Sequence, residues 1–167
     1  IILTAWPISG IKLILVGKAA AGKDFLKNKL SSKGFKAGVS HTTRPPRDTE
    51  IDGKDYHFVD ISTFKNMINN GEFIEYMEFN SWYYGQTEID FDSADVMIMS
   101  KDGLDMLPKK YRDQCIVIYL DPSRIERIKR LETRNDVNDT IVRRMNTDDE
   151  QFKEFRDYEI RIRNADF

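Results

Sequence analysis

The sequence predicts an α/β fold with a mostly parallel sheet. Three short apolar runs are expected to form buried strands, at residues 11–16, 96–99 and 116–120. These runs are rich in Ile, Val and Leu and lack the polar alternation of a half-exposed strand. Segments with helical spacing separate them, and strands that alternate with helices are typical of a parallel sheet.

The first half of the chain carries clear helix and turn signals. Residues 23–33 have apolar positions at helical spacing, and Gly34 follows their end. Residues 38–59 are polar and contain a Pro-Pro pair, which predicts turns and short strands. Residues 62–70 again have helical spacing, with Gly71 as the stop signal.

The second half continues the alternation. Residues 72–86 are rich in aromatic side chains, which favours strands. The charged segments 122–134 and 139–155 predict helices. Residues 159–163 alternate between polar and apolar side chains, so a last strand is expected there.

Composition narrows the class of protein. A chain of 167 residues has the length of one domain, and its net charge of −2 argues against bulk binding of nucleic acid. No apolar run approaches the roughly 18 residues of a membrane span, and residues 1–10 lack the signals of a secretory leader. The single cysteine, Cys115, lies in an apolar run and predicts a buried thiol. We expect a cytoplasmic monomer or homodimer that binds neither nucleic acid nor membrane.

A phosphate-binding loop is predicted at residues 17–24. The segment Gly17-Lys18-Ala19-Ala20-Ala21-Gly22-Lys23-Asp24 fits the pattern G-x-x-x-x-G-K and stands between a predicted strand and a predicted helix. Its glycines allow backbone N–H groups to turn toward phosphate oxygens, and the helix N-terminus adds partial positive charge. Lys23 would contact the β- and γ-phosphates of ATP. The predicted ATP-binding residues here are Gly17, Ala19, Ala20, Ala21, Gly22, Lys23 and Asp24.

Asp24 occupies the position at which Ser or Thr usually offers a hydroxyl to Mg²⁺. A carboxylate is also a hard oxygen ligand for Mg²⁺, so Asp24 is predicted to be a metal ligand. Alternatively, Asp24 only stabilises the first turn of the helix through the helix dipole. The sequence leaves both roles open.

Several segments closely resemble guanylate kinases, in the same order along the chain. The segments are residues 40–50, 52–59, 71–76, 82–85, 130–134, 143–145 and 164–167. Ordered agreement over several motifs is much more specific than the phosphate loop alone.

The resemblance implies a P-loop kinase fold, with a parallel-sheet core, an inserted nucleotide-binding subdomain and a helical lid. The implied boundaries are about 10–37, 93–123 and 153–167 for the core, 38–92 for the GMP-binding subdomain and 124–152 for the lid. The implied reaction is in-line transfer of the γ-phosphoryl group of ATP to GMP or dGMP, with Mg²⁺ as cofactor.

Two arginines and two tyrosines are expected to hold the phosphate of GMP. Arg44 and Arg47 flank a Pro-Pro turn, and paired guanidinium groups can grip a phosphate through charge-assisted, fork-shaped contacts. By the resemblance, Tyr56 and Tyr84 complete this phosphate site. Packing is the alternative role for both tyrosines.

The resemblance also assigns the guanine site. Glu75 occupies the position that accepts the N1–H and N2–H groups of guanine, and Ser40 the position that bonds the base oxygen. Gln86 replaces a hydroxyl of the family, and its amide can also donate to O6. Glu75 as a plain surface carboxylate is the alternative. The implied GMP-binding residues are Ser40, Arg44, Arg47, Tyr56, Glu75, Tyr84, Gln86 and Ser100.

The charged helices match the lid of the family. Arg130, Arg134 and Arg144 correspond to lid arginines, with a solvated helix face as the alternative for any one of them. Together with Lys23 and Arg44, they are the predicted catalytic residues. The acceptor oxygen is already anionic, so no general base is required. Asn164 matches a residue that contacts adenine.

The chain departs from the family near its second apolar run. Ile98 and Ser100 replace acidic residues, and the connection 85–96 is short enough to predict a trimmed helix. Gln86 and Ser100 keep open a deoxynucleoside monophosphate kinase of broader specificity. A non-catalytic guanylate-kinase-like protein-binding module is a third alternative, which the intact phosphate loop disfavours.

Overall fold

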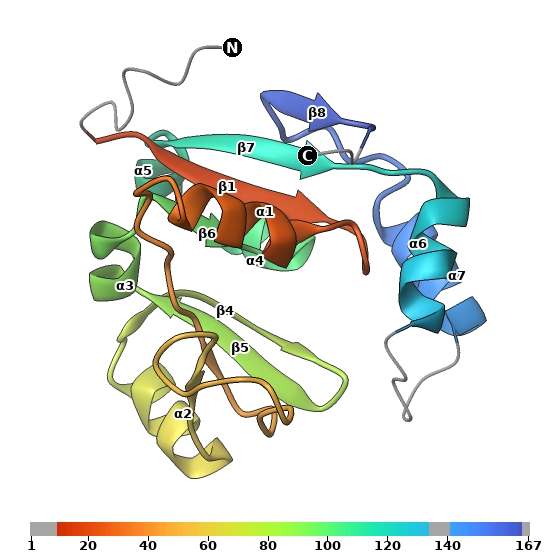
Figure 1. Cartoon of the computed structure of the whole chain (residues 1–167). Helices are drawn as coiled ribbons and strands as arrows, with labels where there is room; N and C mark the ends of the chain where they lie inside the picture. The colour runs from red at the N-terminus through yellow and green to blue at the C-terminus, as the bar shows by residue number, and fades with distance from the viewer. Residues whose placement is uncertain (1–9, 134–140, 165–167) are drawn as a thin grey trace.

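The computed structural model describes residues 10–133 and 141–164 of the chain. Its first sheet is parallel throughout, with the strand order β6-β1-β7-β8 (Figure 1). The strands are β1 (Lys12–Gly17), β6 (Val96–Ile98), β7 (Cys115–Leu120) and β8 (Ile160–Ile162). The predicted α/β fold and all four strands of the predicted parallel sheet are confirmed.

Alternate side chains of β1 pack into two separate layers, as the two-residue period of a strand requires. Leu13 and Leu15 pack with Leu30 of α1 (Lys23–Ser31) on one face of the sheet. Ile14 and Val16 enter a second cluster on the other face, which also receives Tyr119. Both faces of the sheet are therefore covered, which explains the continuous apolar runs in the sequence.

Three short helices supply side chains to the second cluster. They are α3 (Glu88–Ser93), α4 (Lys101–Met106) and α5 (Lys109–Arg112), which contribute Phe91, Leu104 and Tyr111. The predicted trimmed helix between Gly85 and Val96 is the six-residue α3. The sequence did not predict α4 and α5, because helices of six and four residues are too short to display a helical period. Cys115 is buried in this cluster, as expected.

A second sheet lies within residues 38–92 and has the strand order β3-β2-β5-β4. Its strands are β2 (His41–Thr42), β3 (His57–Phe58), β4 (Phe73–Phe79) and β5 (Trp82–Thr87), and α2 (Ile61–Asn69) packs against it through Phe64. Asn80 and Ser81 connect β4 to β5 with positive φ angles of 52° and 64°. Such a two-residue turn matches the twist of a hairpin.

Two further helices lie beside the first sheet, α6 (Arg124–Glu132) and α7 (Ile141–Gln151) (Figure 1). The prediction that the last helix continues to residue 155 is wrong. The chain leaves the helix after Gln151, and Phe152 and Phe155 pack around Tyr119 instead. Within the described residues, none of the helices combines the length and the apolar character that a membrane span requires.

Candidate active site

The loop between β1 and α1 has the backbone of a phosphate site. Gly22 (φ 99°) and Ala20 (φ 58°) adopt left-handed conformations, which turn successive peptide groups inward. A Cβ atom on Gly17 would lie 2.5 Å from the carbonyl oxygen of Leu120, so only glycine fits there. Lys23 folds back across the loop, and its Nζ donates to the carbonyl oxygens of Gly17 (2.6 Å) and Lys18 (3.1 Å).

Two pockets adjoin this loop, with volumes of about 270 and 390 Å³. Ala19 and Lys23 line both pockets on the side of the loop, and Tyr56 and Tyr84 line both on the side of the second sheet. The two pockets therefore form one cleft between the phosphate loop and the second sheet.

The predicted GMP-binding residues divide between the two ends of this cleft. Ser40, Glu75 and Ser100 line the first pocket, whereas Arg44 and Arg47 line the second. The structure thus places the residues predicted for the guanine base and those predicted for the phosphate at separate ends, with the phosphate loop beside both.

Glu75 is a buried carboxyl group facing the cleft from β4. Glu75 is 8% exposed, and burial raises the pKa of its side chain to about 7. Gly103 lies so close that a Cβ atom there would be 2.8 Å from Glu75 Oε2. A carboxylate held in such a place gains more from new hydrogen-bond donors than an exposed one would.

Ser40 and Gln86 form a hydrogen-bonded pair at the same end of the cleft. Ser40 Oγ donates to Gln86 Oε1 over 2.8 Å. Gln86 is fully buried behind Ser40 and does not line the cleft, and its Nε2 has no hydrogen-bond partner among the described residues. Only Ser40 of this pair is placed to contact a ligand directly.

Glu50 organises the arginine end of the cleft. Its Oε1 accepts from Arg44 Nη2 (2.7 Å), and its Oε2 accepts from the backbone N–H of Arg47 (2.8 Å). The guanidinium of Arg44 lies 5.4 Å from the ring centre of Tyr56. Burial, together with the nearby charge of Asp24, raises the pKa of Tyr56 to about 12. The phenol therefore remains a hydrogen-bond donor at neutral pH.

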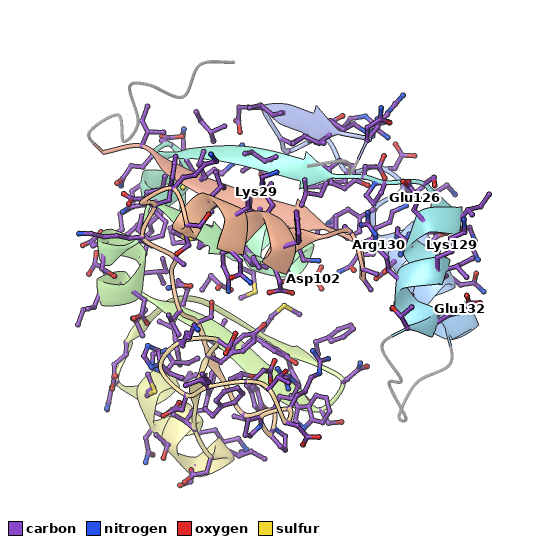
Figure 2. The ribbon with its side chains drawn as sticks, viewed as in Figure 1. Lys29, Asp102, Glu126, Lys129, Arg130 and Glu132 are labelled. Atoms are coloured by element: carbon purple, nitrogen blue, oxygen red, sulfur yellow. The ribbon has the colours of Figure 1, made fainter. Side chains whose placement is uncertain are left out.

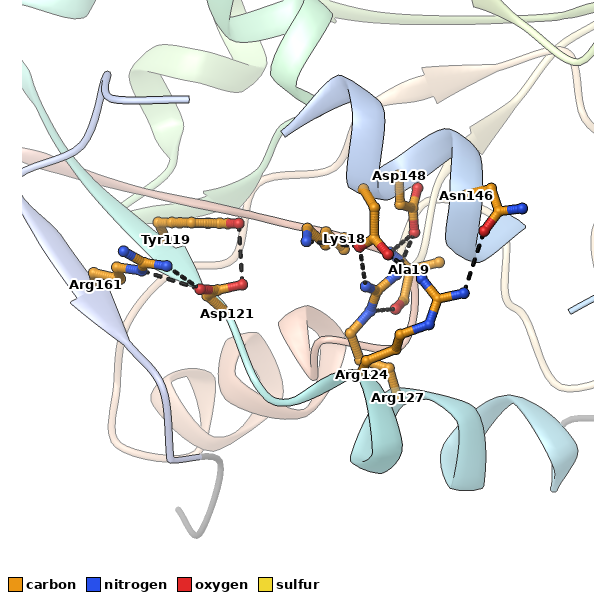
Figure 3. Close-up of polar contacts among 10 residues, drawn as sticks. Lys18, Ala19, Tyr119, Asp121, Arg124, Arg127, Asn146, Asp148 and Arg161 are labelled. Carbon is orange, nitrogen blue, oxygen red and sulfur yellow. Dashed lines mark hydrogen bonds and ion pairs between the residues drawn. The ribbon is translucent and has the colours of Figure 1, made fainter. Parts of the chain in front are cut away.

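A network of ion pairs and hydrogen bonds joins α6 and α7 to the phosphate loop (Figure 3). Asp148 Oδ2 of α7 accepts from the backbone N–H of Ala19 (2.8 Å) and from Arg127 Nη2 (2.7 Å). Arg127 is 1% exposed and also donates to the carbonyl oxygen of Ala19 (3.0 Å). Lys18 Nζ pairs with Asp149 Oδ1 over 2.8 Å. An acidic side chain thus occupies a loop N–H group that could otherwise bind a phosphate.

The remaining predicted residues differ in placement. Arg130 Nη1 donates to the carbonyl oxygen of Ala20 over 3.1 Å and lies between α6 and the loop (Figure 2). Asp24 is exposed on the first turn of α1 and lines the second pocket. Asn164 is exposed after β8, outside the lining of the cleft. Arg134 and the side chain of Arg144 lie outside the described part of the structure.

Sequence reasoning missed several residues of the cleft. Lys27 follows Lys23 by one helical turn, is almost fully buried and lines both pockets. Its spacing from Lys23 could have signalled this position. The roles of Glu50, Arg127 and Asp148 depend on contacts across the fold, and no local pattern reports them.

Comparisons with known proteins show which family the chain belongs to. A family model for guanylate kinase matches residues 9–167. A guanylate kinase of Myxococcus xanthus is 35% identical over 81% of this chain and 69% of the relative. Another, of Blochmanniella floridana, is 33% identical over 95% of this chain and 81% of the relative. The solved structure of a guanylate kinase from Anaplasma phagocytophilum superposes with a TM-score of 0.68 at 24% identity, covering 94% of this chain and 78% of that one.

Proposed function

The chain belongs to the guanylate kinase family and phosphorylates GMP with ATP, and we propose that it does so in the cleft between the phosphate loop and the second sheet. The observation that carries the proposal is the shared lining of the two pockets. Lys23 stands at the junction of the pocket that holds Glu75 and the pocket that holds Arg44 and Arg47. A donor phosphate on the loop would therefore lie next to an acceptor phosphate held by the arginines.

The guanine base would bind at the end of the cleft that contains Glu75. The ionised carboxylate would accept both the N1–H and the N2–H group of guanine. Rotating the Gln86 amide by half a turn lets its unpartnered Nε2 donate to Ser40 Oγ. The hydroxyl proton of Ser40 is then available to O6 of the base.

Phosphoryl transfer would then need positioning and charge neutralisation rather than a base. Arg44, Arg47, Tyr56 and Tyr84 would hold the acceptor phosphate, whose anionic oxygen attacks the γ-phosphorus. The bond from that phosphorus to the β–γ bridging oxygen breaks, and ADP leaves with the electron pair. Lys23 would exchange its two carbonyl partners for the phosphates and neutralise charge as it develops.

We propose that the Asp24 carboxylate holds Mg²⁺ beside the loop. It lines the second pocket together with Lys23, and a hard oxygen donor at this point fits the ligand preference of Mg²⁺. When bound with ATP, the ion would supply charge neutralisation at the phosphates.

We expect Asp24→Ser to raise the Mg²⁺ concentration for half-maximal activity severalfold without changing the KM for GMP. The hydroxyl supplies a weaker ligand than the carboxylate, while both side chains suit the start of a helix. Activity would be titrated with Mg²⁺ at fixed ATP. Asp102→Ser is the matched control, because Asp102 lies on α4 (Figure 2) and is not among the residues that line either pocket of the cleft. Superimposable curves for Asp24→Ser and the unmodified enzyme would show that Asp24 is not a metal ligand.

A second expected result concerns Asp148. Asp148→Asn should tighten ATP binding by about fivefold, because a neutral oxygen competes less well than a carboxylate for the Ala19 N–H group. The free energy of unfolding should fall at the same time, since the buried Arg127 loses a charged partner. The dissociation constant of ATP would be measured by equilibrium titration. Glu150→Gln removes an exposed carboxylate from the same helix and should leave it unchanged. Weaker ATP binding in Asp148→Asn would contradict the competition.

The substrate assignment is tested by a coupled assay of ATP consumption with GMP, dGMP, AMP, CMP, UMP and dTMP. We expect kcat/KM for GMP and dGMP to exceed that for the other monophosphates by on the order of 10³-fold or more. A site built to pair the donors of one base discriminates this strongly against bases that lack them. Similar turnover across the deoxynucleotides would favour the broader-specificity kinase instead.

A further inference from the structure

Three metal-ligating side chains meet outside the cleft, at His41, His57 and Asp90. His41 Nδ1 lies 3.4 Å from Asp90 Oδ2, and His57 Nε2 lies 3.6 Å from Asp90 Oδ1. One ligand atom from each residue can be chosen so that all three lie within 4.8 Å of one another. None of the three lines the cleft, so phosphoryl transfer gives them no role.

Regular structure positions all three side chains. His41 of β2 and His57 of β3 are direct partners in a parallel strand pair, so their side chains share one face of the second sheet. Asp90 belongs to α3, which follows β5 directly. Thr87 Oγ1 donates to Asp90 Oδ2 (2.6 Å) and accepts from the backbone N–H of Asp90 (3.2 Å). Hydrogen bonds of this kind orient carboxylate ligands in metal sites.

A second observation is independent of the spacing. His41 Nδ1 is buried and has no hydrogen-bond partner among residues 10–133 and 141–164. A buried polar atom without a partner destabilises the folded protein. The lone pair of this nitrogen could bind a cation, which would give the nitrogen a partner.

We propose that His41, His57 and Asp90 bind a divalent transition-metal ion of the Zn²⁺ class. Tetrahedral coordination at about 2.0–2.1 Å places ligand atoms about 3.3 Å apart. Each imidazole nitrogen lies near that distance from a different oxygen of Asp90, His41 Nδ1 from Oδ2 and His57 Nε2 from Oδ1. Two imidazoles and one carboxylate suit Zn²⁺ and its neighbours, whereas Mg²⁺ prefers oxygen ligands alone. Both histidines and Asp90 line a third, separate pocket, so a fourth position is open to water or to another ligand.

The position of this site implies that a bound ion would stabilise the second sheet. Ser40 and Tyr56, both predicted GMP-binding residues, directly precede His41 and His57. The bound ion would join these two segments to α3, the helix that leads back to β6 of the first sheet. We therefore expect the metal to raise the Tm of the protein in the absence of nucleotides, because it binds only the folded arrangement.

The test uses the full chain after removal of metals with a chelator. Calorimetric titration with Zn²⁺ should give one site per chain, and Co²⁺ should produce the visible absorption of a tetrahedral complex with nitrogen ligands. His57→Ala and Asp90→Asn should each weaken Zn²⁺ binding by at least about 100-fold. Asp92 is an exposed carboxylate on the same helix, so the Asp92→Asn variant should bind Zn²⁺ as the unmodified protein does.

Two outcomes would overturn the proposal. One is that the unmodified protein fails to bind one equivalent of Zn²⁺ or to give the Co²⁺ absorption, a result that does not depend on how well any variant folds. The other is that His57→Ala and Asp90→Asn, shown to be folded by circular dichroism, bind Zn²⁺ with unchanged affinity.

Discussion

Lys23→Ala should lower kcat for GMP phosphorylation by on the order of 10³-fold or more. The ammonium group lies on the loop where both pockets meet, and it already spans the loop through the carbonyl oxygens of Gly17 and Lys18. Its removal leaves the developing charge on the transferring group without its nearest fixed cation. Steady-state rates at saturating ATP and GMP measure the loss.

Lys29→Ala is the matched control for this result. Lys29 lies on the same helix and is exposed to solvent (Figure 2). The Lys29→Ala variant should retain nearly full activity. This result would exclude a general effect of removing a lysine from α1. If Lys23→Ala keeps a kcat within tenfold of the unmodified enzyme, Lys23 has no direct part in the transfer.

Glu75→Gln should reduce kcat/KM for GMP by about 10³-fold and change the weak reaction with AMP by less than tenfold. The amide retains the shape of the side chain but places an N–H group against a base donor. A site built to pair buried polar groups loses most when a partner no longer matches. Steady-state assays with both substrates measure the change in discrimination. Equal losses for GMP and AMP would make Glu75 a structural residue.

The Glu75→Gln variant also distinguishes the pH dependence of base recognition from the titration of the substrate phosphate. The proposed contacts with guanine require the ionised carboxylate of Glu75, and burial raises the pKa of this group in the free enzyme to about 7. We expect kcat/KM for GMP to fall as the pH drops below 7, approaching tenfold for each pH unit. In Glu75→Gln this component should be absent, leaving only the titration of the substrate phosphate.

As the pH rises, the free energy of unfolding should fall while kcat/KM for GMP increases. The unfolded chain loses the Glu75 proton near pH 4.5, whereas the folded protein keeps it up to about pH 7. The free energy of unfolding therefore falls as the pH rises between these values, by up to about 3 kcal/mol. Above pH 7, Glu75→Gln should be more stable than the unmodified protein by up to the same amount, measured by denaturant unfolding without nucleotides.

Local sequence patterns predicted the parts of the fold that depend on local physics. The buried strands β1 and β7 are continuous apolar runs, and α1 has both its helical spacing and its terminal Gly34. The phosphate loop was predictable because its conformation needs glycine at Gly17 and Gly22. Each of these features is determined by residues that are close to one another in the sequence.

The missed features depend on contacts between distant segments. Arg127 looks like any surface arginine on a charged helix, yet it is buried because α7 brings Asp148 against it. The sequence predicts that the Gln86 amide contacts the base, whereas the pairing of β2 with β5 places it behind Ser40. The cluster of His41, His57 and Asp90 likewise forms only when β2, β3 and α3 come together.

In the proposed binding mode, the contact between Asp148 and the Ala19 N–H group couples ATP binding to a conformational equilibrium. Only molecules in which α7 has released the loop can accept the donor phosphates at that group. The observed dissociation constant of ATP then equals the intrinsic value divided by the released fraction. Variants of α7 far from any phosphate should therefore shift the range of ATP concentration over which the enzyme responds.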